Sequence, residues 1–246
     1  LSALDLIQAH GWQGEWVVVL DGPGEVEMPD DPRIRILELP GKIGVAGARN
    51  TALCMTQGEW VLPVDGDDLV DGEGLLSLLR KVEAHPHIDW WAHNRTLLDG
   101  QQTVHHIPAS RTWAPGELQE SWGVPFHFHP NSLLIRRQAA LQVGGWPALD
   151  ASEDLGMILA LNHDFWGRQE TERVILYRSW PGQTIAGENF RHSKPIAFQM
   201  IEQMVNAGRE ARGRKPIQAP PAFGSGGVYT GTEPIGTTTT KKEPEE

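Results

Sequence analysis

Two short apolar runs in the first part of the chain each end abruptly at an aspartate. Residues 16–20 lead into Asp21, and residues 60–64 lead into Asp65. Continuous apolar runs rich in β-branched residues are typical of buried strands in a parallel sheet. Open α/β sheets bind ligands at the carboxyl ends of such strands, so both aspartates are expected at a ligand-binding edge.

Strands and helices are predicted to alternate through residue 93. The patterns indicate strands at 15–20, 33–39, 60–64 and 88–92, and helices at 1–9, 46–55 and 75–84. This alternation predicts an α/β fold with a mostly parallel central sheet flanked by helices.

The pattern changes after residue 93. The later segments suggest a hairpin turn at Asp99-Gly100, a strand over 127–136 leading into a helix from Arg137, a helix over 152–162, a strand over 174–177 and a helix over 196–212. From residue 215 a mixture of Gly, Thr, Pro and Glu predicts a disordered tail. We therefore expect a folded domain over 1–214, with halves 1–93 and 94–214, and a tail over 215–246.

Composition excludes several classes of protein. The 246 residues carry a formal net charge of −11, from 32 acidic and 21 basic side chains, which argues against a broad nucleic-acid surface. Cys54 is the only cysteine, so an intrachain disulfide is impossible and a reducing cytoplasm fits. We expect neither a transmembrane segment nor a signal peptide, because long apolar runs and a basic start are missing.

The cluster that follows the second apolar run is the strongest chemical signal. Asp65, Asp67 and Asp68 place three carboxylates within four residues. Clustered acids repel one another unless a cation neutralises them, and Mg²⁺ or Mn²⁺ prefers such oxygen ligands. The sequence therefore predicts a divalent metal that holds a diphosphate here. A solvated acidic turn that caps the following helix is the alternative.

Four blocks of sequence together resemble the family 2 glycosyltransferases of the GT-A fold. They are residues 17–22, residues 44–53, residues 64–68, and a composite of 131–137, 144–146 and 152–154. Each is weak alone, but their order and spacing are specific. Relative to this family the sequence starts within the first helix, so the donor-binding half, 1–93, is expected to lack the usual first strand.

The resemblance assigns donor and metal roles to particular residues. Asp67 is the leading metal ligand, Asp65 contacts the ribose or a metal-bound water, and Asp68 is a ligand or a supporting acid. The remaining assignments are Asp21 on the base, Arg49 and more weakly Lys42 on the phosphates, and His192 on the metal from a late loop. An Asx turn, a helix-surface ion pair and a surface histidine are the alternatives for Asp21, Arg49 and His192.

The last block carries the acceptor side. Inverting transfer needs a base that removes the proton of the acceptor hydroxyl. The resemblance assigns this role to Asp154, and the neighbouring Glu153 is expected to raise one pKa of the pair. Gly145 and Trp146 are expected to line the acceptor pocket. An acidic first turn that complements the helix dipole is the alternative for the pair.

The sequence thus predicts a metal-dependent inverting glycosyltransferase. Its donor is a nucleotide-diphosphate sugar, with a UDP-sugar the commonest in the family, and its acceptor is a saccharide or another hydroxyl compound. A nucleotidyltransferase of related α/β fold would share the acidic metal site. A non-catalytic sugar-binding module would keep the ten tryptophans. Both alternatives rank lower, because the chain retains Asp67 and the acidic pair at 153–154.

Overall fold

The larger sheet is organised around β5 (Trp90–Leu97), in which seven of eight residues are buried. The computed structural model describes residues 1–98, 103–104, 107–122, 128–179 and 188–220. Strand β5 pairs with β8 (Leu133–Arg136) in the antiparallel direction and with β9 (Gly167–Tyr177) in the parallel direction. The sheet order is β3-β8-β5-β9-β4, with β6 paired to β5 and β7 paired to β9.

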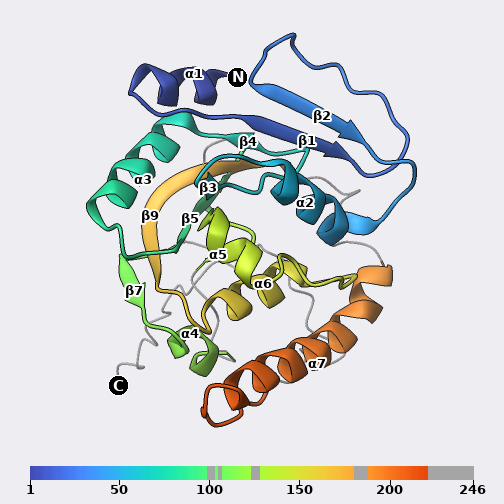
Figure 1. Cartoon of the computed structure of the whole chain (residues 1–246), viewed down its shortest axis with the longest axis vertical. Coiled ribbons are helices and arrows are strands. Elements are labelled where there is room, and N and C mark those ends of the chain that lie inside the picture. The colour runs from blue at the N-terminus through green and yellow to red at the C-terminus, as the bar shows by residue number, and fades with distance from the viewer. Residues whose placement is uncertain (99–102, 105–106, 123–127, 180–187, 221–246) are drawn as a thin grey trace, which may run out of the picture.

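The remaining strands are short. They are β1 (Trp16–Leu20), β2 (Ile34–Glu38), β3 (Trp60–Val61), β4 (Leu69–Val70), β6 (Thr103–Val104) and β7 (Arg111–Trp113). The helices are α1 (Ser2–Ala9), α2 (Gly44–Met55), α3 (Gly72–Ala84), α4 (Glu117–Glu120), α5 (Arg137–Gln142), α6 (Glu153–Leu161) and α7 (Glu188–Glu210). Figure 1 shows α6 between α7 and the sheet.

Two hydrophobic cores lie on opposite faces of β5. Successive strand residues point to opposite faces, so Trp90 and Trp91 feed different cores. Trp90 packs with residues of α2, α5, α6 and α7. Trp91 packs with residues of α1 and α3. Both indoles are fully buried, and together they anchor the helical layers to the sheet.

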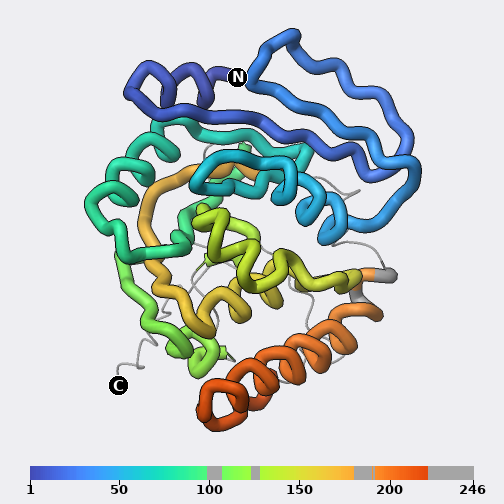
Figure 2. Tube along the Cα trace, viewed as in Figure 1, coloured from blue at the N-terminus to red at the C-terminus, as the bar shows by residue number. Residues whose placement is uncertain are grey.

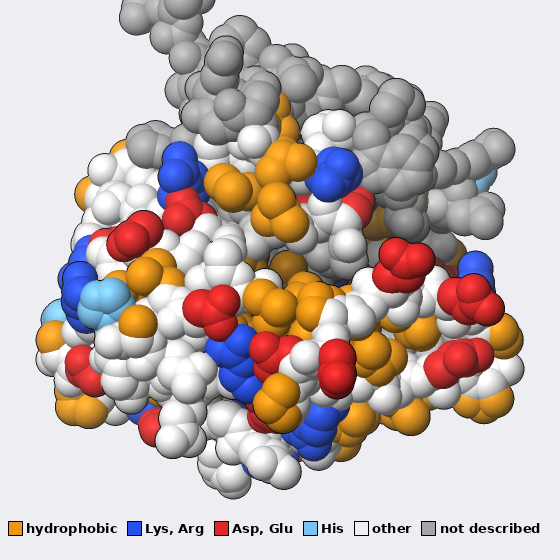
Figure 3. All heavy atoms as spheres, turned by 90° about the horizontal axis from the view of Figure 1, so that it is seen from above, with side chains coloured by type: hydrophobic (Ala, Val, Ile, Leu, Met, Phe, Trp, Pro, Cys, Tyr) orange, Lys and Arg blue, Asp and Glu red, His pale blue; other side chains and the backbone are white. Residues whose placement is uncertain are grey.

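Strands β1 and β2 form a separate parallel sheet. Helix α2 packs on β1, whereas Trp16 and Ile36 stay 41% and 46% exposed. Figure 3 shows hydrophobic and acidic side chains interspersed on the face seen from above. Figure 2 shows that this N-terminal unit and α7 lie at opposite ends of the molecule.

The α/β fold expected from the sequence is confirmed, and its sheet is mixed. Parallel pairs β1–β2 and β5–β9 accompany antiparallel pairs elsewhere. The strand expected over 60–64 is shorter, because Pro63 has no N–H to donate to a neighbouring strand. The turn expected at 99–100 lies outside the described residues, although β5 and β6 on either side are antiparallel partners.

Residues 215–220, expected to begin a disordered tail, lie against α7. The Asn206 side chain accepts from the Ile217 N–H and donates to its carbonyl oxygen, both at 2.8 Å. Ile217 and Ala219 also pack against the larger core. Residues 221–246 lie outside the described part of the chain. Among the described residues, no helix is long and apolar enough to cross a membrane.

Candidate active site

The acidic loop, residues 65–68, is held between two short strands. Strand β3 before it pairs with β8, and β4 after it pairs with β9. The Asp68 N–H donates to the Asp65 carbonyl oxygen at 3.0 Å, which closes a tight turn. The Asp65 side chain is 35% exposed, and the Asp68 side chain is 2% exposed. The loop therefore offers Asp65 to an open surface and buries Asp68.

Arg49 joins the acidic loop to the acidic pair at the start of α6. Its Nη2 donates to Asp65 Oδ1 and its Nη1 donates to Glu153 Oε1, each at 2.6 Å. Burial lowers the pKa of Arg49, but the charges of Asp65 and Glu153 outweigh burial and raise it overall. One cation on α2 thus brings together two motifs that are 88 residues apart in sequence. In this geometry Arg49 orients the acidic loop, and its expected contact with the donor phosphates stays a prediction.

Asp154 is the strongly perturbed acid of the site. Burial, and then the charge of Glu153, raise its pKa to about 6, while Arg49 opposes the rise. Its Oδ1 accepts the Leu155 N–H at 2.8 Å, which fixes the carboxylate at the first turn of α6. This agrees with the expected effect of Glu153 on the pair. A carboxylate with this pKa is a competent proton acceptor near neutral pH.

Two further polar residues at the site were not predicted from the sequence. The Asn131 side chain donates to Asp65 Oδ2 at 2.9 Å, so both oxygens of Asp65 have protein partners. Lys194 of α7 lies near Asp154. Burial lowers the pKa of Lys194 overall, and the charge of Asp154 partly opposes this by raising it. Asn131 stands at the start of a block quoted for the family, but nothing in its local pattern indicates a contact with Asp65.

Asn50 clamps the backbone at the glycine-rich turn before α6. Its side chain donates to the Trp146 carbonyl oxygen and accepts the Trp146 N–H, each at 2.8 Å. Gly145 has a φ of +76°, and a Cβ added there would lie 2.1 Å from Asn50 Oδ1. Trp146 is only 4% exposed and belongs to the core. The structure gives both residues a packing role, and their contact with an acceptor stays a prediction.

Gly145→Ala is expected to lower the free energy of unfolding by about 3 kcal/mol, because the methyl group would break the Asn50 clamp. Gly144→Ala is the matched control, since Gly144 has a φ of +83° and no atom within 4 Å of its added Cβ. The control carries only the cost of a left-handed backbone, roughly 1–2 kcal/mol. Thermal unfolding of both variants tests this, and equal midpoints would contradict the clamp.

Asp68 is committed to protein partners. Its Oδ2 accepts from Arg95 Nη2 at 3.0 Å, and its Oδ1 accepts the Arg178 N–H at 2.9 Å. Burial raises the pKa of Asp68, while the Arg178 N–H and the Arg95 charge oppose the rise. Of its two expected roles, this geometry favours the supporting acid over the metal ligand.

The acidic loop fits a metal that also takes oxygens from its substrate. No three side chains of the His, Cys, Asp and Glu types converge among the described residues. Mg²⁺ commonly uses only one or two protein carboxylates and completes its shell with phosphates and water. Asp67 is half-buried beside Asp65 and would supply such a carboxylate. His192 is exposed on α7, and its approach to a metal stays a prediction.

Asp21 caps the start of α2. Its Oδ1 accepts the Ile43 N–H at 2.7 Å, and its Oδ2 accepts the Gly44 N–H at 3.1 Å. Lys42 is exposed in the same loop, where its Cγ lies 3.1 Å from the position of a Cβ added to Gly22. Asp21 and Lys42, two of the residues expected to contact the donor, are therefore neighbours, although contact with a base or a phosphate stays a prediction.

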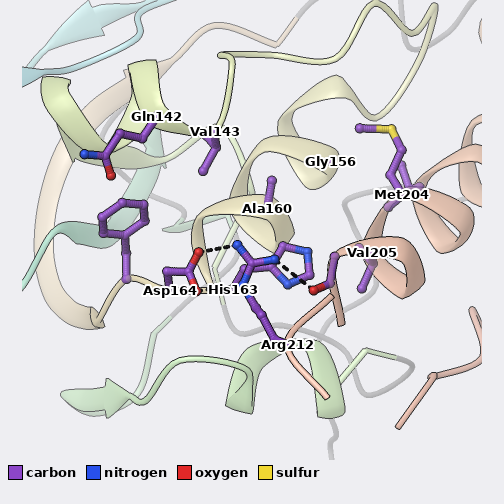
Figure 4. Close-up of a pocket in the computed structure, with 12 residues that line it drawn as sticks. Gln142, Val143, Gly156, Ala160, His163, Asp164, Met204, Val205 and Arg212 are labelled. Atoms are coloured by element: carbon purple, nitrogen blue, oxygen red, sulfur yellow. Dashed lines mark hydrogen bonds and ion pairs between the residues drawn. The ribbon is translucent and has the colours of Figure 1, made fainter. Parts of the chain in front are cut away.

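A cavity of about 320 Å³ is lined on one side by α6, from Gly156 to Ala160, and by the residues that follow this helix. Figure 4 shows Gly156 and Ala160 of α6 facing Met204 and Val205 of α7 across it. Arg212 Nε donates to Asp164 Oδ1 at 2.7 Å on its polar side. This cavity contains none of the residues expected at the active site.

Solved structures of known proteins share this fold. TarS residues 1–349 from S. aureus, in complex with UDP-GlcNAc, matches with a TM-score of 0.54 at 16% identity, over 79% of this chain and 62% of that chain. The TarS complex with UDP gives a TM-score of 0.53 at 17% identity, over 85% of this chain and 67% of that chain. Identities this low establish the fold alone, which is the GT-A fold of nucleotide-sugar transferases.

Sequence comparison finds a family and a relative that are similar to part of the chain. Residues 25–144 match the description Glycosyl transferase family 2. The succinoglycan biosynthesis protein ExoO of Rhizobium meliloti (strain 1021) is 32% identical over 74 residues, which are 28% of this chain and 21% of that protein. The family match covers 120 of the 246 residues, so it is this part of the chain that is similar to glycosyltransferase family 2. The chain spans about a fifth of the length of ExoO.

Proposed function

We propose that the protein is a metal-dependent inverting glycosyltransferase that moves a sugar from a nucleotide diphosphate to an acceptor hydroxyl. The single observation that carries the proposal is the Arg49 bridge. It places the acidic loop, suited to a diphosphate and its metal, beside a buried acid suited to remove a proton. Donor and acceptor chemistry need to meet at one point, and this bridge brings their residues together.

In the proposed reaction the acceptor oxygen attacks the anomeric carbon as Asp154 takes its proton. The bond from the anomeric carbon to the diphosphate breaks on the opposite face, and the diphosphate leaves with the electron pair. This single displacement inverts the anomeric configuration. A divalent metal held by Asp67, with Asp65 beside it, would stabilise the charge that grows on the diphosphate.

The other residues of the site orient these groups. Arg49 and Asn131 hold the two oxygens of Asp65. Glu153 is held by Arg49, and its charge adds to the effect of burial, which is the main reason that the pKa of Asp154 is raised. Lys194 adds a half-buried cation near Asp154. Asp21 and Lys42 are proposed to contact the base and the phosphates of the donor.

The donor class follows by analogy. TarS, which shares the fold, was solved with UDP-GlcNAc and with UDP. We propose a UDP-sugar for this protein, and a saccharide or another hydroxyl compound as acceptor. A panel of UDP, GDP, dTDP and CDP, each titrated calorimetrically with and without Mn²⁺, tests the choice of nucleotide.

Asp67→Asn is expected to abolish the Mn²⁺-dependent part of nucleotide binding, because it removes the charge of the leading metal ligand. The control is Asp71→Asn, because Asp71 caps α3 through the Gly74 N–H and belongs to no proposed ligand set. The control should retain the full effect of Mn²⁺ on affinity. Mn²⁺-dependent binding of wild-type strength in Asp67→Asn would reject the metal assignment. Failure of the wild-type protein to bind any nucleotide would reject the proposed function.

A further inference from the structure

Arg95 is a buried cation toward the carboxyl end of strand β5, where it contacts the acidic loop. Only 4% of the residue is exposed. Its Nη2 donates to Asp68 Oδ2 at 3.0 Å, and its Nη1 lies 3.1 Å from His129 Nδ1. Its guanidinium stacks over the Tyr177 ring at 4.2 Å from the centroid. One side chain thus contacts the acidic loop, the segment before β8 and the end of β9.

The contact with His129 fixes the state of that ring. A guanidinium only donates hydrogen bonds, and the Asn131 N–H also donates to Nδ1 at 3.1 Å. Nδ1 is therefore the acceptor nitrogen, and the ring proton is on Nε2. Nδ1 also lies 3.9 Å from Asp154 Oδ2. Because Nδ1 is an acceptor, it donates nothing to Asp154. Arg95 therefore contacts the acidic loop directly through Asp68 and positions the His129 ring that lies next to Asp154.

The end of β9 reinforces the same loop. The Arg178 N–H donates to Asp68 Oδ1 at 2.9 Å, and Arg178 Nε donates to the Asp67 carbonyl oxygen at 2.9 Å. The Asp67 carbonyl oxygen and the Asp68 carboxylate are thus both held by Arg178, the residue after Tyr177. The orientation of the Asp67 side chain therefore depends on the position of Asp68, which Arg95 and the Arg178 N–H hold at the end of β9.

Stability gives little reason for this arrangement. A buried ion pair adds little net stability over apolar side chains of the same volume. Arg95 Nε is also buried without a hydrogen-bond partner among the described residues, which adds a cost. An apolar residue would satisfy the strand better, so a role in the site is the better explanation.

We propose that Arg95 is a positioning residue that fixes the acidic loop and the His129 ring as one unit. This inference rests on the proposed function, because the property that Arg95 would control is the metal-dependent binding of a diphosphate at Asp67. It also makes Asp68 a supporting acid. Asp68→Asn should therefore lose only part of the Mn²⁺-dependent nucleotide binding, whereas Asp67→Asn should lose all of it.

Arg95→Met is expected to weaken Mn²⁺-dependent nucleotide binding by about tenfold to a hundredfold. Losing a group that orients a metal ligand typically has an effect of this size. Binding without Mn²⁺ should change by less than about twofold. Asp68→Asn should weaken Mn²⁺-dependent binding by about tenfold and retain a clear effect of Mn²⁺. Calorimetric titration of the donor nucleotide, with and without Mn²⁺, measures all these affinities.

Arg209→Met is the matched control for general damage to the fold. Arg209 is equally buried, at 3% exposed, and donates to the Gln119 side chain at 3.1 Å, outside the site. It should lower the midpoint of thermal unfolding as Arg95→Met does and leave the effect of Mn²⁺ unchanged. If both variants weaken Mn²⁺-dependent binding equally, Arg95 has only a structural role.

Two other results overturn the inference. One is an unchanged Mn²⁺ effect in Arg95→Met and in Asp68→Asn, with the wild-type protein binding normally. The other is a complete loss in Asp68→Asn, which would make Asp68 a direct ligand. Should Arg95→Met fail to fold, Asp68→Asn alone decides between these outcomes. Lack of any nucleotide binding by the wild-type protein would instead reject the proposed function.

Discussion

Asp154→Asn is expected to lower kcat by about a thousandfold while the protein stays folded and binds the donor nucleotide with unchanged affinity. The amide cannot take the proton of the acceptor hydroxyl. Its oxygen can still accept the Leu155 N–H that Asp154 Oδ1 accepts at 2.8 Å, so the turn at the start of α6 is preserved. Turnover and nucleotide titration on the same preparation separate the two effects.

The same substitution is expected to stabilise the fold at neutral pH. The pKa of Asp154 is raised from 3.8 to about 6, so between these values the folded protein binds more protons than the unfolded chain. Stability therefore falls as pH rises through about 4 to 6, and above this window the folded state bears the full cost of a buried carboxylate. Asn removes that cost, roughly 1–3 kcal/mol.

The unfolding midpoint of Asp154→Asn should therefore exceed that of the wild-type protein by several degrees at about pH 8. The difference should shrink toward zero near pH 4, where the wild-type carboxyl is protonated in both states. The kcat of the wild-type protein should rise with pH through an apparent pKa near 6. Full turnover in Asp154→Asn, or a variant less stable at every pH, would contradict the assignment of Asp154 as a desolvated base.

The strands that support the site show where sequence patterns succeed and fail. Strand β1 and the start of β5 were predicted, because both are continuous apolar runs, although in the structure only the β5 run is buried. The second half of β5 was missed, because His93, Asn94, Arg95 and Thr96 are polar and yet buried. Most of β9 was missed for the same reason, since Gln169 and Glu170 are buried with partners elsewhere in the chain. Hydrogen bonds to residues far away in sequence allow these polar segments to form buried strands.

The site follows the same division. Asp65 and Asp154 are recognisable from local motifs, and the structure places both beside one cation. Asn131 and Arg95 act through partners 66 and 27 residues away in sequence, and neither lies in a pattern that specifies its partner. Residue spacing therefore indicates which groups are chemically active. The residues that orient them require the three-dimensional fold.

Arg49→Met is expected to lower kcat/KM by at least a hundredfold and the free energy of unfolding by about 3–5 kcal/mol. The side chain is 13% exposed and gives 2.6 Å hydrogen bonds to both Asp65 and Glu153. Its removal leaves two carboxylates facing one another without a cation, next to Asp154. Thermal unfolding and steady-state kinetics on the purified variant measure the two losses.

Arg49→Lys separates charge from geometry, because a lysine ammonium keeps the cation but lacks the planar fork that reaches both acids. The charge of Arg49 lowers the pKa of Asp154, so its loss in Arg49→Met should move the acid limb of the pH–kcat profile to higher pH. Arg49→Lys should leave that limb nearly in place and still lose turnover.

Adding Glu153→Gln to Arg49→Met removes one of the charges that raise the pKa of Asp154. The double variant should therefore regain stability and the acid limb of the wild-type protein without regaining activity. Wild-type turnover in the double variant would show that the bridge between the two acidic motifs has no role in catalysis.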